Sequence, residues 1–298
     1  MPVKEIVGTH EAVAFRPGAV LTATMLEAAI GAQAAFLRLA YAGYGYGILT
    51  GLELTDDGGA LFLEPGILHA PSGFFLCQER VNLTAFIEAR EGEWSPRYGN
   101  KLLLRPEPTE GVTHITRTLM KLDVLDVAAG QDVRADEMPL LTFDGAKIQD
   151  AKARLTLPQE LAAFSRDKHA DVNILDTPFA CPSGTTFAPR FFRALQAAIA
   201  GKKVRDALDQ SMLLLLSAER VLPLDALRTY CKEKGTAITG DAKDARGALY
   251  EAVCEAVGKT QVAAAAPASK KASTSSPKNT THKWWGTGPK PAELGEWN

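Results

Sequence analysis

The strongest constraint on the fold is a change of periodicity along the chain. Between residues 47 and 144, short apolar runs alternate with turns rich in glycine, proline and aspartate, and no helical spacing separates successive runs. From residue 189 onward, apolar residues recur at the three- and four-residue intervals of a helix face. The sequence therefore predicts an α+β chain with a β-sandwich-like front part followed by a small helical bundle.

Turn residues place the strands of the front part. Asp56-Asp57-Gly58-Gly59 predicts a hairpin of residues 48–54 with residues 60–64, because Asp-Gly pairs favour tight β-turns. Pro71-Ser72-Gly73 predicts a second tight turn within a β-meander. Further strands are predicted over residues 101–105, 118–127 and 140–143.

Ahead of the strands, residues 22–41 are predicted to form a helix. Its apolar face consists of Met25, Ala29, Ala32, Phe36 and Leu39. Gly43, Gly45 and Gly47 leave this helix instead of opening one, and they lack the spacing of a dinucleotide-binding loop. They are therefore interpreted as hinge glycines and not as a phosphate site.

Helix start and stop signals organise the back half. Prolines and glycines mark residues 151–188 as a linker, and Pro189 stands at an early helical position. Four helices are predicted, over residues 189–201, 204–218, 224–234 and 242–257. The predicted domains are residues 1–150 (N-terminal helix and β-sandwich), residues 189–258 (helical domain) and residues 259–298 (extended tail).

Composition excludes several classes of function. A formal net charge of -2 and a pI near 6.2 give no net attraction to polyphosphate, so nucleic acid is not an expected partner. The four cysteines lie far apart, without metal-ligand spacing, which argues against a zinc site and fits a reducing compartment. The N-terminal residues do not form a secretory signal, and no apolar run is long enough to span a bilayer. A cytoplasmic protein without direct membrane insertion is expected.

The C-terminal tail has a composition that cannot build a core. It is rich in alanine, serine, proline and lysine, yet it contains Trp284, Trp285 and Trp297 in polar surroundings. Burial of a large aromatic side chain contributes about 1.5–3 kcal/mol, so isolated aromatics often anchor in a partner. The tail is therefore predicted to be a docking peptide.

The sequence contains no pattern of residues that is typical of a catalytic site. None of the five histidines lies in a nucleophile signature. Asp123 and Asp126 alternate with apolar residues as on a solvated strand face, and Cys181 has no cationic neighbour in sequence that would activate a thiol. A hydrolase using Asp123 or Cys181 is the alternative, but the prediction is a protein that is not an enzyme and has no catalytic residue, cofactor or metal.

Four short motifs together resemble the N-terminal region of baseplate proteins of contractile machines. The motifs are Phe15-Arg16-Pro17-Gly18-Ala19-Val20-Leu21-Thr22, Gly47-Ile48-Leu49-Thr50-Gly51-Leu52-Glu53-Leu54, Glu64-Pro65-Gly66-Ile67 and Ser72-Gly73-Phe74. Their order is similar to that in the TssK family of type VI secretion baseplate subunits and in phage baseplate or tail-fibre-connector proteins.

The resemblance implies a structural adaptor of a contractile phage tail or injection-system baseplate, assembled into a virion or injection particle. It implies a sandwich "shoulder" that binds the baseplate wedge, a helical part that oligomerises, for example as a trimer, and a distal part that receives another component. The expected partner-binding residues are Phe15, Pro17, Gly18 and Leu21, together with the three tail tryptophans. A receptor- or glycan-binding tail protein, with Tyr44, Tyr46, Phe74 and Phe75 stacking on sugar rings, remains the alternative.

Overall fold

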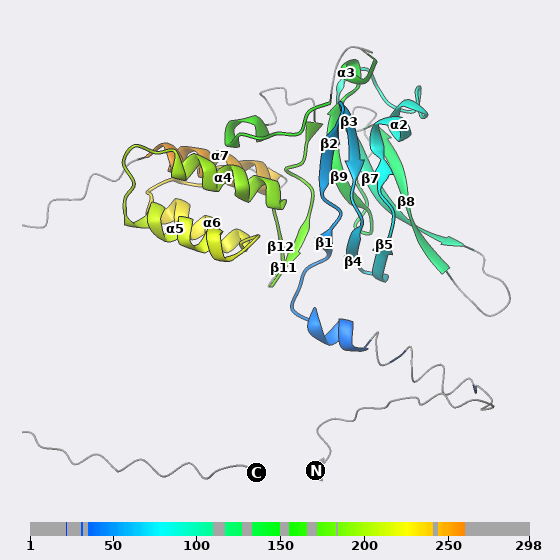
Figure 1. The fold of residues 1–298 in the computed structure, drawn as a ribbon, viewed down its shortest axis with the longest axis horizontal. Helices are drawn as coiled ribbons and strands as arrows, with labels where there is room; N and C mark the ends of the chain where they lie inside the picture. Colours follow the sequence, from blue (N-terminus) through cyan, green and yellow to red (C-terminus); the bar gives the residue numbers. More distant parts are fainter. Residues whose placement is uncertain are drawn as a thin grey trace, which may run out of the picture. The chain divides into compact units, whose positions relative to one another are not determined.

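The fold was obtained as a computed structural model of the chain (Figure 1). By its contacts the chain divides into two units, Met1–Thr260 and Gln261–Asn298. The structure describes residues 22, 31, 35–109, 117–126, 133–149, 155–165, 172–182, 184–240 and 244–259. The predicted partner-binding residues all lie outside these ranges: Phe15, Pro17, Gly18, Leu21, Trp284, Trp285 and Trp297.

Three sheets make up the front part (Figure 1). The five-stranded sheet has the order β12-β11-β1-β4-β5 and contains β1 (Gly47–Gly51), β4 (Gly66–Ala70), β5 (Gly73–Cys77), β11 (Phe179–Cys181) and β12 (Gly184–Thr186). The four-stranded sheet has the order β10-β9-β7-β8 and contains β7 (Tyr98–Thr109), β8 (Arg117–Asp126), β9 (Met138–Asp144) and β10 (Val172–Asn173). The three-stranded sheet contains β2 (Leu54–Asp57), β3 (Ala60–Leu63) and β6 (Val81–Asn82).

Helices follow the sheets, as the sequence predicted. Short helical segments α2 (Leu83–Glu88), α3 (Gly145–Gln149) and η2 (Leu161–Phe164) lie between strands, and the long helices are α4 (Pro189–Ala200), α5 (Ala207–Ala218), α6 (Leu224–Glu233) and α7 (Ala245–Gly258). The mixed α+β class and its order are confirmed. Among the described residues, no helix is both long and apolar enough to cross a membrane.

The first predicted hairpin is only half right. β2 pairs with β3 across the Gly58-Gly59 turn, but β1 leaves this hairpin and pairs with β4. The cause is a kink between β1 and β2, where Gly51 and Leu52 have φ angles of 64° and 46°. Leu52 is the one non-glycine residue with positive φ in the described part of the chain.

The segment predicted to be a linker contributes strands to the front sheets. β10 pairs with β9, and β11 lies parallel to β1, with Ile48 opposite Phe179. These strands are only two or three residues long, and their prolines and glycines stand at strand ends, where they resembled linker punctuation. Phe179 is nonetheless buried, so hydrophobic burial holds the segment in place.

Arg246 ties α7 to these late strands. Its guanidinium donates hydrogen bonds to the carbonyl oxygens of Leu175 and Thr186, at 2.9 Å each, and to that of Thr177, at 3.1 Å. The same group lies over the ring of Phe187. One arginine thus satisfies three carbonyl groups of the chain that joins the sheets to the helices.

A buried ion-pair network holds the helices together. Asp209 on α5 is fully buried, and its Oδ2 accepts a hydrogen bond from Lys202 at 2.6 Å. Its Oδ1 accepts from the Tyr230 hydroxyl at 2.8 Å and also lies 2.8 Å from the Lys234 ammonium group. Burial alone would raise the pKa of Asp209, but these three donors hold that pKa below its ordinary value. Asp206 caps α5 and also accepts from Lys234.

Replacement of Gly51 tests the kink. Gly51→Ala combines a positive φ with a Cβ that would collide with the Pro65 carbonyl, so the free energy of unfolding should fall by more than about 2 kcal/mol. Gly58→Ala is the matched control, because Gly58 has nearly the same φ of 62° but open space around it. Its cost should be about 1 kcal/mol. Urea unfolding measures both, and equal losses would contradict a role for close backbone contact.

Replacement of Asp209 tests the network. Asp209→Asn should cost about 3 kcal/mol at pH 7, because it removes the carboxylate that pairs with Lys202 and leaves buried Lys234 with Asp206 alone. The pKa of Asp209 is lower in the folded chain than in the unfolded chain, so its carboxylate stabilises the fold above the unfolded-state pKa. This stabilisation is lost as the pH falls through the folded-state pKa. The cost of Asp209→Asn should therefore shrink below about pH 4. Asp225→Asn, at an exposed ion pair with Arg228, is the control and should change stability by less than about 0.5 kcal/mol. A pH-independent cost for Asp209→Asn would contradict this account.

Candidate partner-binding surface

The end of the N-terminal helix is exposed to solvent. Residues 35–40 are helical, and the side chains of Phe36 and Leu39 are 70% and 79% exposed. These two residues belong to the apolar face that the sequence predicted, and the remaining residues of that face lie outside the described part of the chain. The described chain therefore does not cover this face itself.

Glycines bring the next segment onto the five-stranded sheet. The Gly45 amide donates to the Gly184 carbonyl at 2.9 Å, and Tyr44 forms a β-bridge with Pro182. A Cβ atom on Gly45 would collide with the main chain of Gly184, and one on Gly47 would meet the main chain of residues 178–180. Close backbone approach, and not hinge freedom, thus accounts for these two glycines.

Aromatic side chains gather where this segment meets β4 and β5. The rings of His69 and Phe74 stack at 4.5 Å, and Tyr46 meets His69 edge-on at 5.0 Å. Tyr41 contacts both Tyr44 (5.1 Å) and Phe74 (6.0 Å). Such offset and edge contacts each stabilise by about 0.5–1.5 kcal/mol beyond simple burial. These contacts therefore hold the aromatic rings in fixed positions relative to one another.

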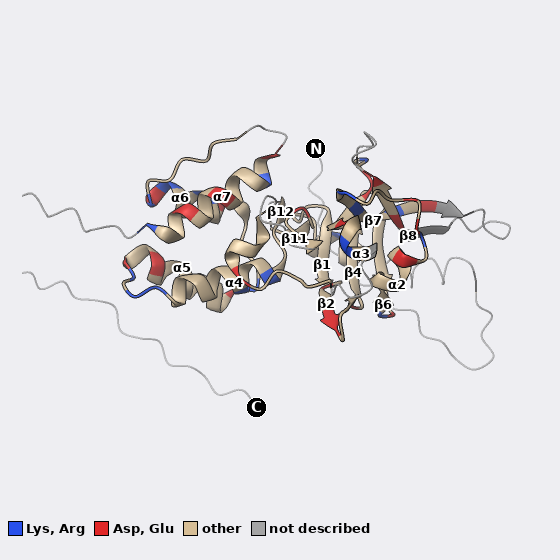
Figure 2. Cartoon of the chain, turned by 90° about the horizontal axis from the view of Figure 1, so that it is seen from above, with Lys and Arg blue, Asp and Glu red and all other residues tan. Residues whose placement is uncertain are grey.

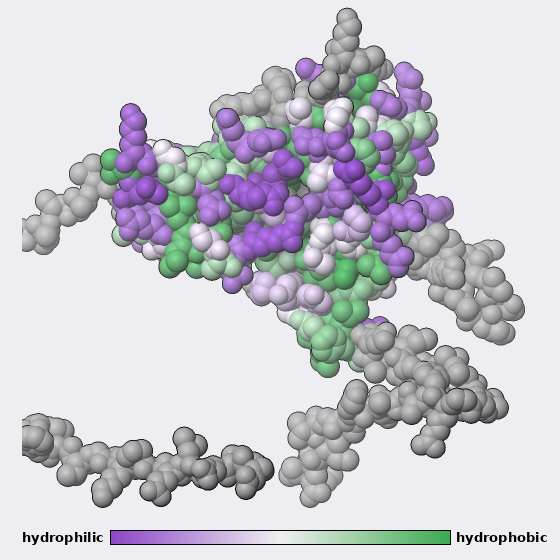
Figure 3. Space-filling model, in the orientation of Figure 1, coloured by the Kyte–Doolittle hydropathy of each residue, from purple (hydrophilic) through white to green (hydrophobic). Residues whose placement is uncertain are grey.

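Charged side chains are missing from the two stretches that build this surface. Residues 39–52 and residues 65–78 contain no Lys, Arg, Asp or Glu, although such residues make up 23% of the chain. In Figure 2, β4 is tan, whereas acidic residues colour the end of β2. Figure 3 shows hydrophobic residues gathered at the lower end of the described chain. We call this surface the apolar tip; it comprises Phe36, Leu39, Tyr41, Tyr46, Phe74 and Leu76.

The apolar tip has the chemistry of a protein interface. Leu76 and Tyr46 are 63% and 53% exposed, in addition to Phe36 and Leu39. Depletion of charge with enrichment of aromatic residues marks the buried core of protein–protein interfaces. Covering each large apolar side chain would contribute about 1.5–3 kcal/mol before the cost of association.

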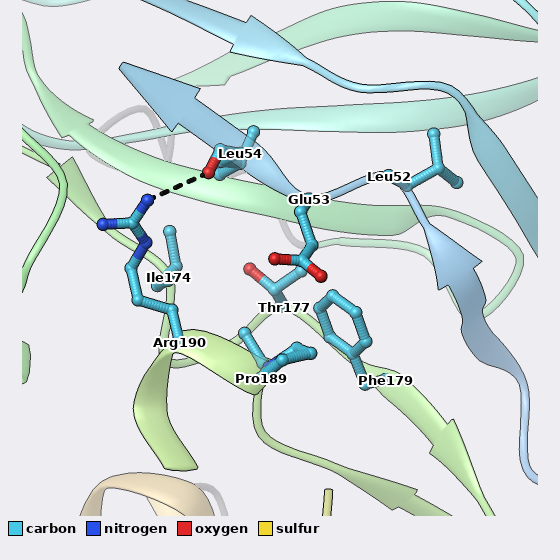
Figure 4. Close-up of a pocket in the computed structure, with 9 residues that line it drawn as sticks. Leu52, Glu53, Leu54, Ile174, Thr177, Phe179, Pro189 and Arg190 are labelled. Carbon is cyan, nitrogen blue, oxygen red and sulfur yellow. Dashed lines mark hydrogen bonds between the residues drawn. The ribbon is translucent and has the colours of Figure 1, made fainter. Parts of the chain in front are cut away.

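A small cavity lies at the junction of the sheets with α4 (Figure 4). Arg190 donates to the Leu54 carbonyl at 3.3 Å, while Glu53 forms ion pairs with Arg193, at 3.1 Å, and with Arg220. Burial lowers the pKa of Arg190. The cavity volume is about 20 Å³, room for one water molecule, so this junction joins structural parts and is not a ligand site.

The residues considered for catalysis have structural surroundings. Asp123 pairs with Arg105 and, at 3.4 Å, with Arg90. Cys181 is buried in β11, and burial raises the pKa of its thiol, which opposes nucleophilic reactivity. Among the described residues, no group of three or more His, Cys, Asp or Glu side chains could hold a metal ion.

The structure brings together three of the four aromatic residues that the sequence singled out for sugar stacking. Tyr44, Tyr46 and Phe74 join the cluster, whereas Phe75 packs against the core. Sequence reasoning missed His69 and Leu76, and the charge-free stretches were the signal that could have found them. His10, His114, His169 and His282 lie outside the described residues.

Exposure of the tip predicts that it contributes little to the stability of the isolated chain. The double variant Phe36→Ser with Leu39→Ser should change the free energy of unfolding by less than about 0.5 kcal/mol in dilute solution. Leu61→Ser, at a fully buried position of β3, is the control and should cost at least about 3 kcal/mol. Urea unfolding monitored by circular dichroism compares them; a large loss in the double variant would show that the tip is covered within one chain.

Comparison with known proteins gives matches to solved structures only. No protein family and no curated protein matches the sequence. The fold is similar to a crystal structure of TssK, with a TM-score of 0.38 and 10% identity over 83% of this chain and 69% of that chain. It is also similar to a chain in a cryo-electron microscopy structure of the type VI secretion TssK-TssF-TssG baseplate subcomplex, with a TM-score of 0.33 and 12% identity over 84% of this chain and 100% of that chain. The chain thus has structural similarity to TssK, a type VI secretion baseplate component, at low sequence identity.

Proposed function

We propose that this chain is a structural adaptor of a contractile phage tail or injection-system baseplate, connecting the wedge to a fibre or distal component. The observation that carries the proposal is the apolar tip, an exposed surface of apolar and aromatic side chains. Arg38, between Phe36 and Leu39, is the one charged residue in the described stretches 35–52 and 65–78 that build it. A protein that works by holding neighbours together needs such a surface, whereas a catalyst needs converging polar groups.

The three motifs within the described residues, 47–54, 64–67 and 72–74, share a structural role in shaping the strands beneath the tip. The Leu52 amide donates to the Pro65 carbonyl at 3.1 Å, and a Cβ on Gly66 would collide with the main chain of residues 50–52. Gly73 adopts a φ of 131° at the turn that opens β5. The resembling residues therefore shape the strands that carry the tip, which supports reading the resemblance as one of architecture.

The remaining parts of the chain receive roles within this proposal. The front sheets form the sandwich-like shoulder that meets the wedge, and α4 to α7 form the bundle that takes part in a homo-oligomer, for example a trimer. Residues 259–298 act as the extended docking tail through Trp284, Trp285 and Trp297. Other baseplate or tail proteins are the partners, and the chain works inside an assembled virion or injection particle.

A glycan receptor is the competing partner, since Tyr46 offers an exposed ring. The tip favours protein, because Phe36, Leu39 and Leu76 are exposed apolar side chains that offer a sugar no hydrogen-bonding group. Sugar sites combine aromatic platforms with several polar side chains that hydrogen-bond hydroxyl groups.

Co-expression with the products of adjacent genes tests the adaptor role. Wild-type chain should co-purify with at least one of them, and both Phe36→Ser/Leu39→Ser and a chain ending at Thr260 should reduce that yield at least about tenfold. The truncation keeps Lys259, whose carbonyl accepts from Lys202 at 3.0 Å, so the helices should stay folded.

The control for this experiment is Leu214→Ser, because Leu214 is 73% exposed on α5, away from the tip residues in sequence. It should leave the yield unchanged. Full co-purification of both the tip variant and the truncated chain would overturn the adaptor proposal, and selective binding of the wild-type chain on a glycan array, lost in Tyr44→Ala/Tyr46→Ala, would favour the receptor alternative.

A further inference from the structure

The outer edge of β5 is an open strand edge. β5 lies at the end of the five-stranded sheet, and its described neighbour is β4 alone. The two strands are joined by the two-residue Pro71-Ser72 loop, which makes Ala70 and Gly73 a hydrogen-bonded pair. Hydrogen-bonded pairs alternate along an antiparallel ladder, so the next ones are Leu68 with Phe75 and Gly66 with Cys77.

The register decides which main-chain groups point outward. Phe74 and Leu76 occupy the intervening positions, so their N–H and C=O groups face away from β4. No described residue makes a hydrogen bond to these groups. Two donors and two acceptors are therefore available along this edge.

β5 also lacks the features that normally block pairing of edge strands. Its sequence, GFFLC, has no charge and no proline, and its register with β4 has no bulge. Two other described edges carry charge: β8 contains Lys121, Asp123 and Asp126, and β2 ends in Asp56-Asp57. β12 is covered by the segment whose Gly45 donates to Gly184.

We infer that β5 pairs with β5 of a second copy of this chain, antiparallel and about a two-fold axis at Phe75. In this register Phe74 lies opposite Leu76 of the second copy, and Leu76 lies opposite Phe74 of the second copy. Both outward-facing pairs then form hydrogen-bonded pairs, giving four main-chain hydrogen bonds. The five-stranded sheets of the two copies become one continuous sheet.

Side chains suit this pairing as well as the main chain. Phe74 and Leu76 lie on the same face of β5, so each exposed leucine packs on a phenylalanine of the other copy. Phe75 meets its equivalent on the opposite face. No charged residue occurs between residues 65 and 78, so the two-fold axis brings no like charges together. Phe74 and Leu76 belong to the apolar tip, so self-pairing occupies the β5 part of the tip and leaves Phe36 and Leu39 to the different proteins of the adaptor role.

Sedimentation velocity of the full chain over a concentration series tests the pairing. Wild type should show a concentration-dependent pairing of two units, whether these are single chains or oligomers joined by the bundle. Leu76→Lys should raise the dissociation constant of that step at least about tenfold. The lysine would stand beside Phe74 of the other copy and close to its own symmetry mate. Adding Phe74→Glu to Leu76→Lys should restore the pairing, since each glutamate then faces a lysine across the axis. Ala85→Lys carries the same charge change at an exposed position of α2, outside both β5 and the helical bundle, and should leave the pairing intact.

Hydrogen exchange supplies a readout that does not depend on a variant. The amides of Phe74 and Leu76 should become protected as the wild-type concentration rises, while amides of other exposed segments should not. A wild type whose units do not pair at about 100 µM, a pairing that Leu76→Lys leaves unchanged, or concentration-independent exchange at both amides would each overturn the inference. None of these results bears on co-purification with neighbouring gene products, so the two proposals fail separately.

Discussion

The front part of the molecule depends on one close crossing of main chain, where Gly51 and Leu52 pass over Pro65 and Gly66. A Cβ atom on Gly51 or on Gly66 would collide with the main chain of the other strand. The left-handed conformation at Gly51 and Leu52 turns the chain out of the five-stranded sheet. Because of that turn, β1 is free to pair with β4 on one side and with β11 on the other, while β2 begins a separate sheet. The pairing of β1 with β4 in turn positions β4 and β5, the strands that carry the apolar tip.

The helical part relies on polar contacts that reach into its interior. The Asp209 carboxylate contacts the ammonium groups of two lysines and the hydroxyl of a tyrosine. Arg246 donates hydrogen bonds to three carbonyl groups of the segment that connects the sheets to the helices. Buried networks of this kind tolerate few alternative arrangements, because any shift leaves a charge unpaired in a low-dielectric setting. They fix where each helix sits more strictly than hydrophobic contact alone would do.

Local signals foretold the long elements well. Pro189, Gly201 and Gly235 mark the ends of α4 and α6 within a residue or two, and the Pro71-Ser72 turn is where the sequence placed it. The sequence did not predict β10 to β12, because two or three residues are too few for a periodic pattern. β10 and β11 also pair with β9 and β1, which lie far away in sequence. The tip was only partly foreseeable: periodicity shows that Phe36 and Leu39 share a face, but it does not show what covers that face. Ring contacts such as His69 with Phe74 depend on strand register, which a single sequence does not give.

The parallel contact between β1 and β11 also bears on how the chain is made. Ile48 leaves the ribosome long before its partner Phe179, and the strands between them belong largely to other sheets. The edge of β1 that β11 later occupies stays vacant throughout that interval of synthesis. Nascent chains shorter than the end of β12 therefore carry two unpaired edges in the five-stranded sheet, and completing the fold on one of them requires closing a long loop. Folding of this sheet is thus expected to follow translation of the late strands, with the nascent front part exposed to chaperones until they emerge.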